Sequence, residues 1–187
     1  QQIEKLAKEN GAMMIADEVQ AGYGRTGDFF AFQKHNIHPD IISIAKGMGN
    51  GFPIGGVLID KNIAPKYGML GTTFGGNHLA CAAGLAVLNI LEKEELLQNT
   101  SAMFDYVKEQ AKEIPQIKNI KGRGLMIGLE FDFEVASLRK DMLYVHQIFT
   151  GSAANKNLLR ILPPLNIEKK HFDTFFKALK ISLANQK

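Results

Sequence analysis

A lysine at the end of a short apolar run, followed at once by a glycine-rich loop, is the feature that most constrains how this chain folds. Residues 41–45 are Ile-Ile-Ser-Ile-Ala, and Lys46 leads into Gly-Met-Gly-Asn-Gly-Phe-Pro-Ile-Gly-Gly. The β-branched run predicts a buried strand. Open α/β sheets hold ligands at the carboxyl ends of their strands, and glycines let the backbone approach a bound group. The segment therefore predicts a ligand site around Lys46.

Lys46 alone allows two interpretations. A partly buried lysine is a good nucleophile toward carbonyl groups, and we expect partial burial at the end of a buried strand. A loop lysine is, however, more often an exposed residue without a catalytic role. Residues elsewhere in the chain are needed to choose between the two.

Asp17 ends a second apolar run, residues 12–16, which also predicts a buried strand. The connection to the strand before Lys46 is long enough for a right-handed parallel crossover. If the two strands are neighbours, both side chains lie in one crevice. This pair suits pyridoxal phosphate (PLP), which needs a lysine for its Schiff base and a carboxylate beside its pyridine nitrogen. An ion pair between Asp17 and Lys46 explains the spacing equally well.

Residues 22–27, Gly-Tyr-Gly-Arg-Thr-Gly, match the G-x-G-x-x-G pattern and raise an NAD-dependent dehydrogenase domain as a second hypothesis. The preceding strand ends in Asp17 and Glu18, which are poor neighbours for a pyrophosphate. The acidic residue expected about twenty positions later has no clear candidate, because Asp40 comes too early. We therefore interpret the segment as a glycine-rich turn.

A loop with Thr72 and Thr73 precedes Asn77, which we predict to cap a buried helix over residues 78–91. Hydroxyls and free backbone N–H groups at the start of a helix favour a phosphate, although a cap without a ligand is the more common case.

Arg160 stands in an apolar run, residues 158–164. Its guanidinium stays charged and therefore needs an anion, most naturally a carboxylate that accepts two hydrogen bonds. That carboxylate belongs either to a substrate or to an internal Asp or Glu, and the run alone favours the internal partner.

The composition excludes several functions. A formal net charge of +3, with both signs interspersed, is too weak for a nucleic-acid footprint. Cys81 is the only cysteine and the five histidines have no metal-ligand spacing, so we expect neither a disulfide framework nor a metal site. Apolar stretches are too short or too broken by charge to span a membrane, and no signal peptide is visible. We expect a reducing, cytoplasmic setting.

Residues 1–10 read as the end of an amphipathic helix and Gln1 is not a methionine, so we interpret the chain as a piece without its natural N-terminal part. The sequence becomes charged at Glu92, where we place a domain boundary, although one helix could continue across it to about residue 113. The other expected elements are a short helix over residues 28–36, strands over 55–59, 125–131, 148–149 and 158–162, and a closing amphipathic helix over 167–185.

Together these motifs resemble the class III PLP-dependent aminotransferases, and within them the acetylornithine and succinylornithine group. The matching segments occur in the family's order and cover nearly the whole chain: residues 15–20, 22–27, 39–41, 45–55, 71–77, 122–128 and 159–165. The resemblance implies an α/β protein with the PLP-dependent transferase fold type I. Residues 1–91 would be the C-terminal part of the large PLP-binding domain, and residues 92–187 the small α+β C-terminal domain.

The resemblance also implies roles for the matched residues. Lys46 would form the Schiff base with PLP and move a proton between the substrate carbon and the cofactor, while Asp17 would pair with the pyridinium nitrogen. Val19 would pack on the ring face, and Gln20 would contact the side of the 3′-oxygen. Thr73 would reach the phosphate of the neighbouring subunit's cofactor, so that a homodimer would share the site.

Arg160 would bind a carboxylate of the amino-acid or 2-oxo-acid substrate. The implied reaction transfers an amino group from N-acetylornithine or succinylornithine to 2-oxoglutarate, in arginine metabolism, with ornithine and 4-aminobutyrate as alternative donors. Because the family also uses residues that this chain lacks, we expect the isolated chain to be inactive. A non-catalytic dimerisation fragment is a further alternative.

Overall fold

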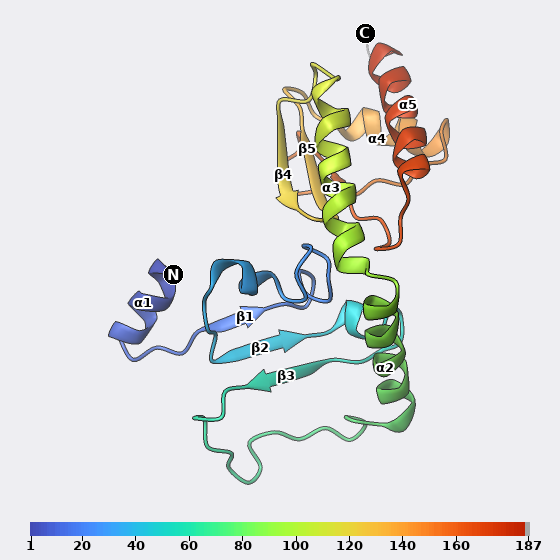
Figure 1. Ribbon diagram of the computed structural model, residues 1–187. Helices are drawn as coiled ribbons and strands as arrows, with labels where there is room; N and C mark the ends of the chain where they lie inside the picture. The colour runs from blue at the N-terminus through green and yellow to red at the C-terminus, as the bar shows by residue number, and fades with distance from the viewer. Residues whose placement is uncertain (186–187) are drawn as a thin grey trace. The chain divides into compact units, whose positions relative to one another are not determined.

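The computed structural model describes residues 1–185, and the chain divides into two compact units between Leu96 and Leu97 (Figure 1). The first unit contains, in chain order, α1 (Gln2–Glu9), β1 (Ile15–Asp17), η1 (Ala31–His35), β2 (Ile41–Ile44), η2 (Lys46–Met48), β3 (Gly56–Ile59) and α2 (His78–Lys93). At and beyond the boundary follow α3 (Leu96–Lys112), β4 (Asn119–Arg123), β5 (Met126–Glu130), α4 (Ala136–Tyr144), β6 (Leu158–Ile161) and α5 (Lys169–Asn185).

The sheet of the first unit has the order β1-β2-β3. β1 and β2 run parallel, and Asp17, the last residue of β1, is paired with Ser43 of β2. β3 runs antiparallel to β2. Because parallel strands end at the same edge of a sheet, the segments that follow β1 and β2 both leave at that edge. The expected parallel pairing of the two apolar runs is confirmed.

A buried carboxylate and a group of aromatic rings hold the connection from β1 to β2 together. Glu18 is 4% exposed, and its two oxygens accept the backbone N–H groups of Ala31 and Phe32, each at 3.0 Å. Phe30 stacks on Phe32 with ring centroids 5.7 Å apart, and Tyr23 meets Phe30 edge-on. A carboxylate that accepts backbone N–H groups satisfies donors that would otherwise lose their hydrogen bonds to water. Glu18 thus fixes the start of η1 beside the end of β1.

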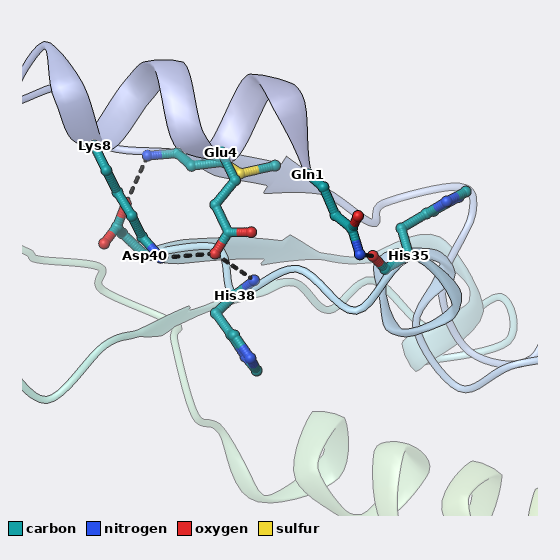
Figure 2. A network of polar contacts seen from close by, with 7 residues as sticks. Gln1, Glu4, Lys8, His35, His38 and Asp40 are labelled. Carbon is teal, nitrogen blue, oxygen red and sulfur yellow. Dashed lines mark hydrogen bonds and ion pairs between the residues drawn. The ribbon is translucent and has the colours of Figure 1, made fainter.

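Polar contacts tie α1 to the loop that precedes β2 (Figure 2). Lys8 Nζ donates a hydrogen bond to Glu4 at 2.8 Å, and the same carboxylate accepts the backbone N–H of His38 at 3.3 Å. The bond from Lys8, supported by the bond from His38, lowers the pKa of Glu4. Asp40 accepts the backbone N–H of Met14 at 2.7 Å, so this carboxylate connects the loop to the start of β1.

α2 begins as predicted but is far less buried than predicted. Asn77 Oδ1 accepts the backbone N–H of Ala80 at 2.9 Å, which confirms the N-cap. Only Ala80, Gly84 and Leu91 are buried along the helix. Its other large apolar side chains include four exposed ones: Leu79, Leu85, Leu88 and Ile90. The prediction of a buried helix is wrong for this chain, because the main packing partner of α2 among the described residues is the short η2 segment.

The strands of the first unit are also more exposed than predicted. Ile15 of β1 is 62% exposed, and in β2 Ile44 alone is buried. The two apolar runs do form strands, but the prediction that these strands are buried is wrong. An apolar run shows that a strand can be buried. Whether it is buried depends on which other elements cover the sheet.

The second unit packs helices against the antiparallel sheet β4-β5-β6. Strand β4 contains Gly122 at φ 98°, where a Cβ would lie 1.9 Å from the carbonyl oxygen of Met126, so no other residue fits. The predicted apolar set of the closing helix is confirmed as part of the core: Phe172, Phe175, Phe176, Leu179 and Leu183. Residues of α3, α4, the sheet and the β4–β5 turn complete that core, among them Val107, Leu125, Leu129, Leu138 and Leu159.

Other expectations for this region are wrong or incomplete. Residues 148–149 do not form a strand, because the N–H of Ile148 bonds to the carbonyl of Met142 at 2.8 Å, outside the sheet. A single bridge at Gly151 joins this segment to Arg160 of β6. The helix does not continue unbroken from α2 into α3, because Glu95 adopts a left-handed backbone at φ 50°. Neither β4 nor α4 was predicted.

Candidate active site

The structure places Lys46 and Asp17 at the same edge of the first sheet. Asp17 ends β1, and Lys46 opens the η2 turn directly after the parallel strand β2. Lys46 has φ 45°, a left-handed conformation that is rare for residues other than glycine. Such strained residues cost on the order of 1–3 kcal/mol and are concentrated at functional sites. Five other non-glycine residues share a positive φ, so it is the combination of this strain with the position at the strand end that singles out this lysine.

The carboxylate of Asp17 is held in place through one of its two oxygens. Its Oδ1 atom accepts the hydroxyl of Ser43 and the backbone N–H of Val19, each at 3.1 Å. Among the described residues, Oδ2 accepts no hydrogen bond and no ion pair joins Asp17 to Lys46. The plain ion pair that the spacing allowed is therefore not formed, and one oxygen is open to a donor from a ligand.

An open pocket of about 470 Å³ lies at the Lys46 turn. It is lined by Arg25, Lys46, Gly47, Asn50, Gly51, Phe52, Pro53 and Ile54. Lys46 itself is exposed in this chain, so the partial burial expected of it is not found. At the back of the turn, the backbone of Met48 lies near the buried Gly84 of α2, where a Cβ would be 3.8 Å from the carbonyl oxygen of Met48.

Two residues near the site were not assigned a role from the sequence. Arg25 belongs to the glycine-rich turn, yet it lines the Lys46 pocket, and burial lowers the pKa of its guanidinium. Glu18 follows Asp17 directly and anchors η1 through its buried carboxylate. The sequence offered two signals for these residues, an arginine within a glycine-rich turn and an acid next to Asp17. Neither pattern predicts which part of the fold the side chain faces.

The turn over residues 22–27 closes on itself through backbone hydrogen bonds, including one from Gly22 to Glu18 at 3.0 Å and one from Gly27 to Gly24 at 3.0 Å. The next helical segment is the short 3₁₀ helix η1. A dinucleotide fingerprint requires glycines that open an α-helix. The segment is therefore a glycine-rich turn, as predicted, and does not have the geometry of a dinucleotide fingerprint.

The remaining candidates of the first unit lie in two places. Val19 is half-buried and Gln20 exposed, and Glu18 separates both from Asp17 at the end of β1. Thr73 is exposed in the loop before α2. No hydrogen bond joins Thr73 to Lys46 or Asp17 within the described part of the chain. Val19 and Gln20 thus belong to the segment that leaves the sheet after Asp17, whereas Thr73 belongs to a separate loop.

Arg160 lies on β6 in the second unit and lines a cavity of about 450 Å³ there. Its Nε atom is buried without a hydrogen-bond partner, and no carboxylate of residues 1–185 pairs with it. The internal partner that the sequence favoured is therefore absent from the described residues. Apolar side chains form much of the remaining wall, among them Ile148, Phe149, Ile161, Leu162 and Phe172. A cation in such surroundings suits a carboxylate attached to an apolar chain.

Residues 1–185 also lack two features that would point to other functions. No cluster of three or more His, Cys, Asp or Glu side chains among residues 1–185 could hold a metal ion. None of the helices described combines the length and the apolar character that a membrane span requires.

The residues at the β1–β2 edge fit PLP. Lys46 offers a primary amine on a strained turn, and Asp17 offers an oxygen without a hydrogen-bond donor. The turn that follows Lys46 is rich in glycine: at Gly49 a Cβ would lie 2.2 Å from the carbonyl oxygen of Phe52, so this tight loop excludes side chains there. A lysine for covalent attachment and a carboxylate for the ring nitrogen are the two groups that this cofactor requires. An α/β fold with this pair of groups at one strand edge is what a PLP-dependent transferase of fold type I requires.

Comparisons with known proteins identify the family. The family model described as aminotransferase class-III matches residues 1–183. The chain is 42% identical over 185 residues to the acetylornithine aminotransferase of Aquifex aeolicus, covering 95% of this chain and 46% of that protein. It is 37% identical over 193 residues to alanine–glyoxylate aminotransferase 2 homolog 2 of Arabidopsis thaliana, covering 95% and 40% of the two chains.

A solved structure supports the same assignment. The solved structure of an ornithine aminotransferase from Plasmodium yoelii matches with a TM-score of 0.82 and 29% identity, over 96% of this chain and 51% of that one. The chain belongs to the class III aminotransferases, as its motifs predicted. It spans about half the length of the relatives that it matches.

Proposed function

We propose that the protein to which this chain belongs transfers an amino group from an ornithine-type donor, N-acetylornithine or succinylornithine, to 2-oxoglutarate with PLP as cofactor, in arginine metabolism. The observation that carries the proposal is the placement of Asp17 and Lys46 at one edge of parallel strands. The acetylornithine aminotransferases among the relatives support the choice of donor. Residues 1–91 would belong to the large PLP-binding domain and residues 92–187 to the small domain.

Lys46 and Asp17 would have complementary roles. Lys46 would hold the cofactor covalently and carry a proton at Nζ to and from the substrate carbon. Asp17 Oδ2 would accept the hydrogen bond of the protonated ring nitrogen, while Ser43 and the N–H of Val19 hold Oδ1. The cofactor, when bound, supplies an electron-withdrawing ring that stabilises negative charge on the substrate carbon. A carboxylate kept in place by two donors is suited to keeping that ring protonated.

Val19 and Gln20 follow Asp17 and would complete the cofactor contacts, with Val19 against the ring face and Gln20 toward the 3′-oxygen. Thr73, which is exposed, would have the role that the family resemblance implies for it and reach the cofactor phosphate of a neighbouring subunit. A homodimer with a shared site is therefore part of the proposal.

Arg160 would bind a substrate carboxylate. Its buried Nε has no partner among the described residues, and it lines the apolar cavity of the second unit. A guanidinium binds a carboxylate with two parallel hydrogen bonds, which fixes the orientation as well as the position of the substrate. The substrates are thus a small amino acid and a 2-oxo acid.

The donor is the part of the proposal with the most alternatives. Ornithine and 4-aminobutyrate are the nearest, since the relatives include an ornithine aminotransferase structure. A relative at 37% identity is named an alanine–glyoxylate aminotransferase, so identity at this level is shared by relatives named for different substrates.

The test uses the complete PLP-loaded protein. N-acetylornithine, succinylornithine, ornithine and 4-aminobutyrate are added one at a time, and the visible absorbance of the lysine-bound cofactor is followed. We expect rapid loss of that band with one of the first two donors. Lys46→Ala should reduce turnover by about 10³-fold or more. Lys61→Ala, which removes an exposed loop lysine after β3, should have no effect.

The outcomes separate the parts of the proposal. A band that no donor discharges would retain the PLP site but contradict the reaction. Fast discharge by ornithine or 4-aminobutyrate alone would retain the reaction and change the donor. Full activity of Lys46→Ala would overturn the assignment of the nucleophile.

A further inference from the structure

Arg160 is flanked by a glycine on each side. Across the sheet it is paired with Gly128 of β5, and on its other side it forms the single bridge with Gly151. Side chains at directly paired positions stand on the same face of a sheet. Both neighbours of this arginine on its face therefore lack a side chain.

The two glycines leave room for different groups. A Cβ at Gly128 would meet three carbons of the Leu158 side chain at 2.8–3.0 Å. A Cβ at Gly151 would instead lie 2.8 Å from Nε of Arg160, 3.3 Å from Nη2 and 3.4 Å from Cβ. Gly128 thus admits the half-buried side chain of Leu158, and Gly151 admits the guanidinium of Arg160.

The backbone at Gly151 cannot easily retreat from this contact. Gly151 N–H donates to the carbonyl of Arg160 at 2.7 Å, and Arg160 N–H donates back at 3.2 Å. Arg139 Nη2 donates to the neighbouring carbonyl of Thr150 at 3.0 Å. Gly151 is not among the residues with positive φ, so alanine could adopt its backbone without strain. A side chain at position 151 would therefore push the Arg160 side chain into a different direction.

We propose that Gly151 is a positioning residue, which fixes the direction of the Arg160 guanidinium in its cavity and thereby sets the affinity for the substrate carboxylate. This inference rests on the proposed role of Arg160. Both residues line the same cavity, and Nε, the atom that a Cβ at Gly151 would meet first, is the buried atom without a partner. Moving the far end of a flexible side chain costs little stability, whereas displacing a substrate-binding group by about 1 Å can cost up to a hundredfold in rate.

The experiment compares Gly151→Ala with two reference variants in the complete PLP-loaded enzyme. Arg160→Ala first identifies the substrate whose KM depends on this arginine. For that substrate, Gly151→Ala should raise KM about tenfold or more and change kcat by less than about twofold. The dissociation constant of glutarate, a dicarboxylate that cannot react, should rise by the same factor in calorimetry. Tm should stay within about 2 °C of the parent.

Gly128→Ala is the matched control, because it adds the same methyl group on the other side of Arg160. Its Cβ meets Cγ as well as both methyl carbons of Leu158, whereas at Gly151 only one atom lies closer than 3.0 Å, so Gly128→Ala should lower Tm more than Gly151→Ala while leaving KM and the glutarate affinity unchanged. The opposite signatures of the two glycines distinguish positioning of the guanidinium from packing of the unit.

Different results contradict different statements. If Arg160→Ala leaves every KM and the glutarate affinity unchanged, the proposed role of Arg160 is wrong, and the inference with it. If Arg160→Ala weakens binding but Gly151→Ala does not, the role of Gly151 alone is wrong. A Gly151→Ala variant that loses as much Tm as Gly128→Ala would show that the backbone absorbs the collision, which also overturns the inference.

Discussion

The second unit buries a continuous apolar core, whereas the first unit, nearly equal in length, buries scattered apolar residues around a small sheet. Every large side chain with an exposed fraction below 2% belongs to the second unit, among them Leu125, Leu159, Phe172 and Leu179. Most exposed large apolar residues, by contrast, lie in the first unit, on β1, β3, α2 and the loop that precedes α2.

The candidate cofactor residues lie in the unit with the smaller core. Lys46 and Asp17 depend on a short parallel strand pair, the Glu18 carboxylate and one helix contact at η2. Arg160, in contrast, extends from a sheet that helices cover. Because buried apolar area dominates folding stability, the stability of this chain is concentrated away from its proposed catalytic lysine.

The largest effect should come from the core of the second unit. Leu179 is 0% exposed, and Leu179→Ala removes a buried side chain and leaves a cavity, which should cost about 3 kcal/mol of unfolding free energy. Leu85 on α2 is 61% exposed, so Leu85→Ala should cost less than about 0.5 kcal/mol. Urea unfolding followed by helical circular dichroism measures both. Equal losses for the two variants would contradict the difference between the units.

The exposure of the first unit also explains which predictions from sequence were wrong. The runs before Asp17 and Lys46 were recognised as strands because their β-branched residues are suited to a sheet, whatever covers it. Their burial could not be predicted in the same way, since burial depends on elements far away in the sequence. The same reasoning applies to α2. Its cap at Asn77 depends on neighbouring residues and was predicted, whereas its exposure depends on elements distant in the sequence.

The candidate site shows the same division between local and distant information. A strand-end lysine before glycines and a strand-end aspartate are local patterns, and a single parallel pairing brings them together. Arg25 lines the Lys46 pocket because the crossover folds back, and Gly151 meets Arg160 through one bridge. Neither contact follows from spacing, because the residues between Gly151 and Arg160 do not form a regular hairpin with a predictable register.

A smaller loss of stability should follow removal of the Glu18 carboxylate. Glu18→Ala leaves the N–H groups of Ala31 and Phe32 without their acceptor, which should cost about 1–3 kcal/mol. The effect should be confined to the first unit, with faster hydrogen exchange at these two amides and unchanged exchange in α5. Glu92→Ala, at an exposed position, is the control. Loss of protection throughout both units would show that the units unfold together.

The helix cap of α2 should contribute less again. Asn77→Ala removes the acceptor for the N–H of Ala80 and should destabilise the start of α2 by about 1 kcal/mol. Asn77→Asp keeps an acceptor at the helix start and should retain most of that stability. Hydrogen exchange at Ala80 distinguishes the two variants. If Asn77→Ala leaves this amide protected, the helix start is held by packing at Gly84 instead of by its cap.

The smallest expected effect compares one carboxylate in each unit as the pH falls. In the second unit, Glu130 accepts hydrogen bonds from Lys121, Asn119 and Asn155, each at 2.9 Å, and these bonds lower its pKa below the ordinary value of 4.5. In the first unit, the bond from Lys8 lowers the pKa of Glu4. A carboxyl group whose pKa is lower in the folded state stabilises the fold above its unfolded pKa, and this contribution is lost as the pH falls through the folded pKa.

Both units should therefore lose stability below pH 4.5, each through its own carboxylate. Glu130→Gln should reduce the pH dependence of amide protection in the second unit. Glu4→Gln should reduce the pH dependence of protection in α1 alone. Hydrogen exchange between pH 6 and pH 3 measures both, residue by residue. Because both side chains are near the surface, salt should weaken the two effects alike. If Glu4→Gln changes the pH dependence of amides in α5, the units are coupled, and the first unit draws on the core of the second for its stability.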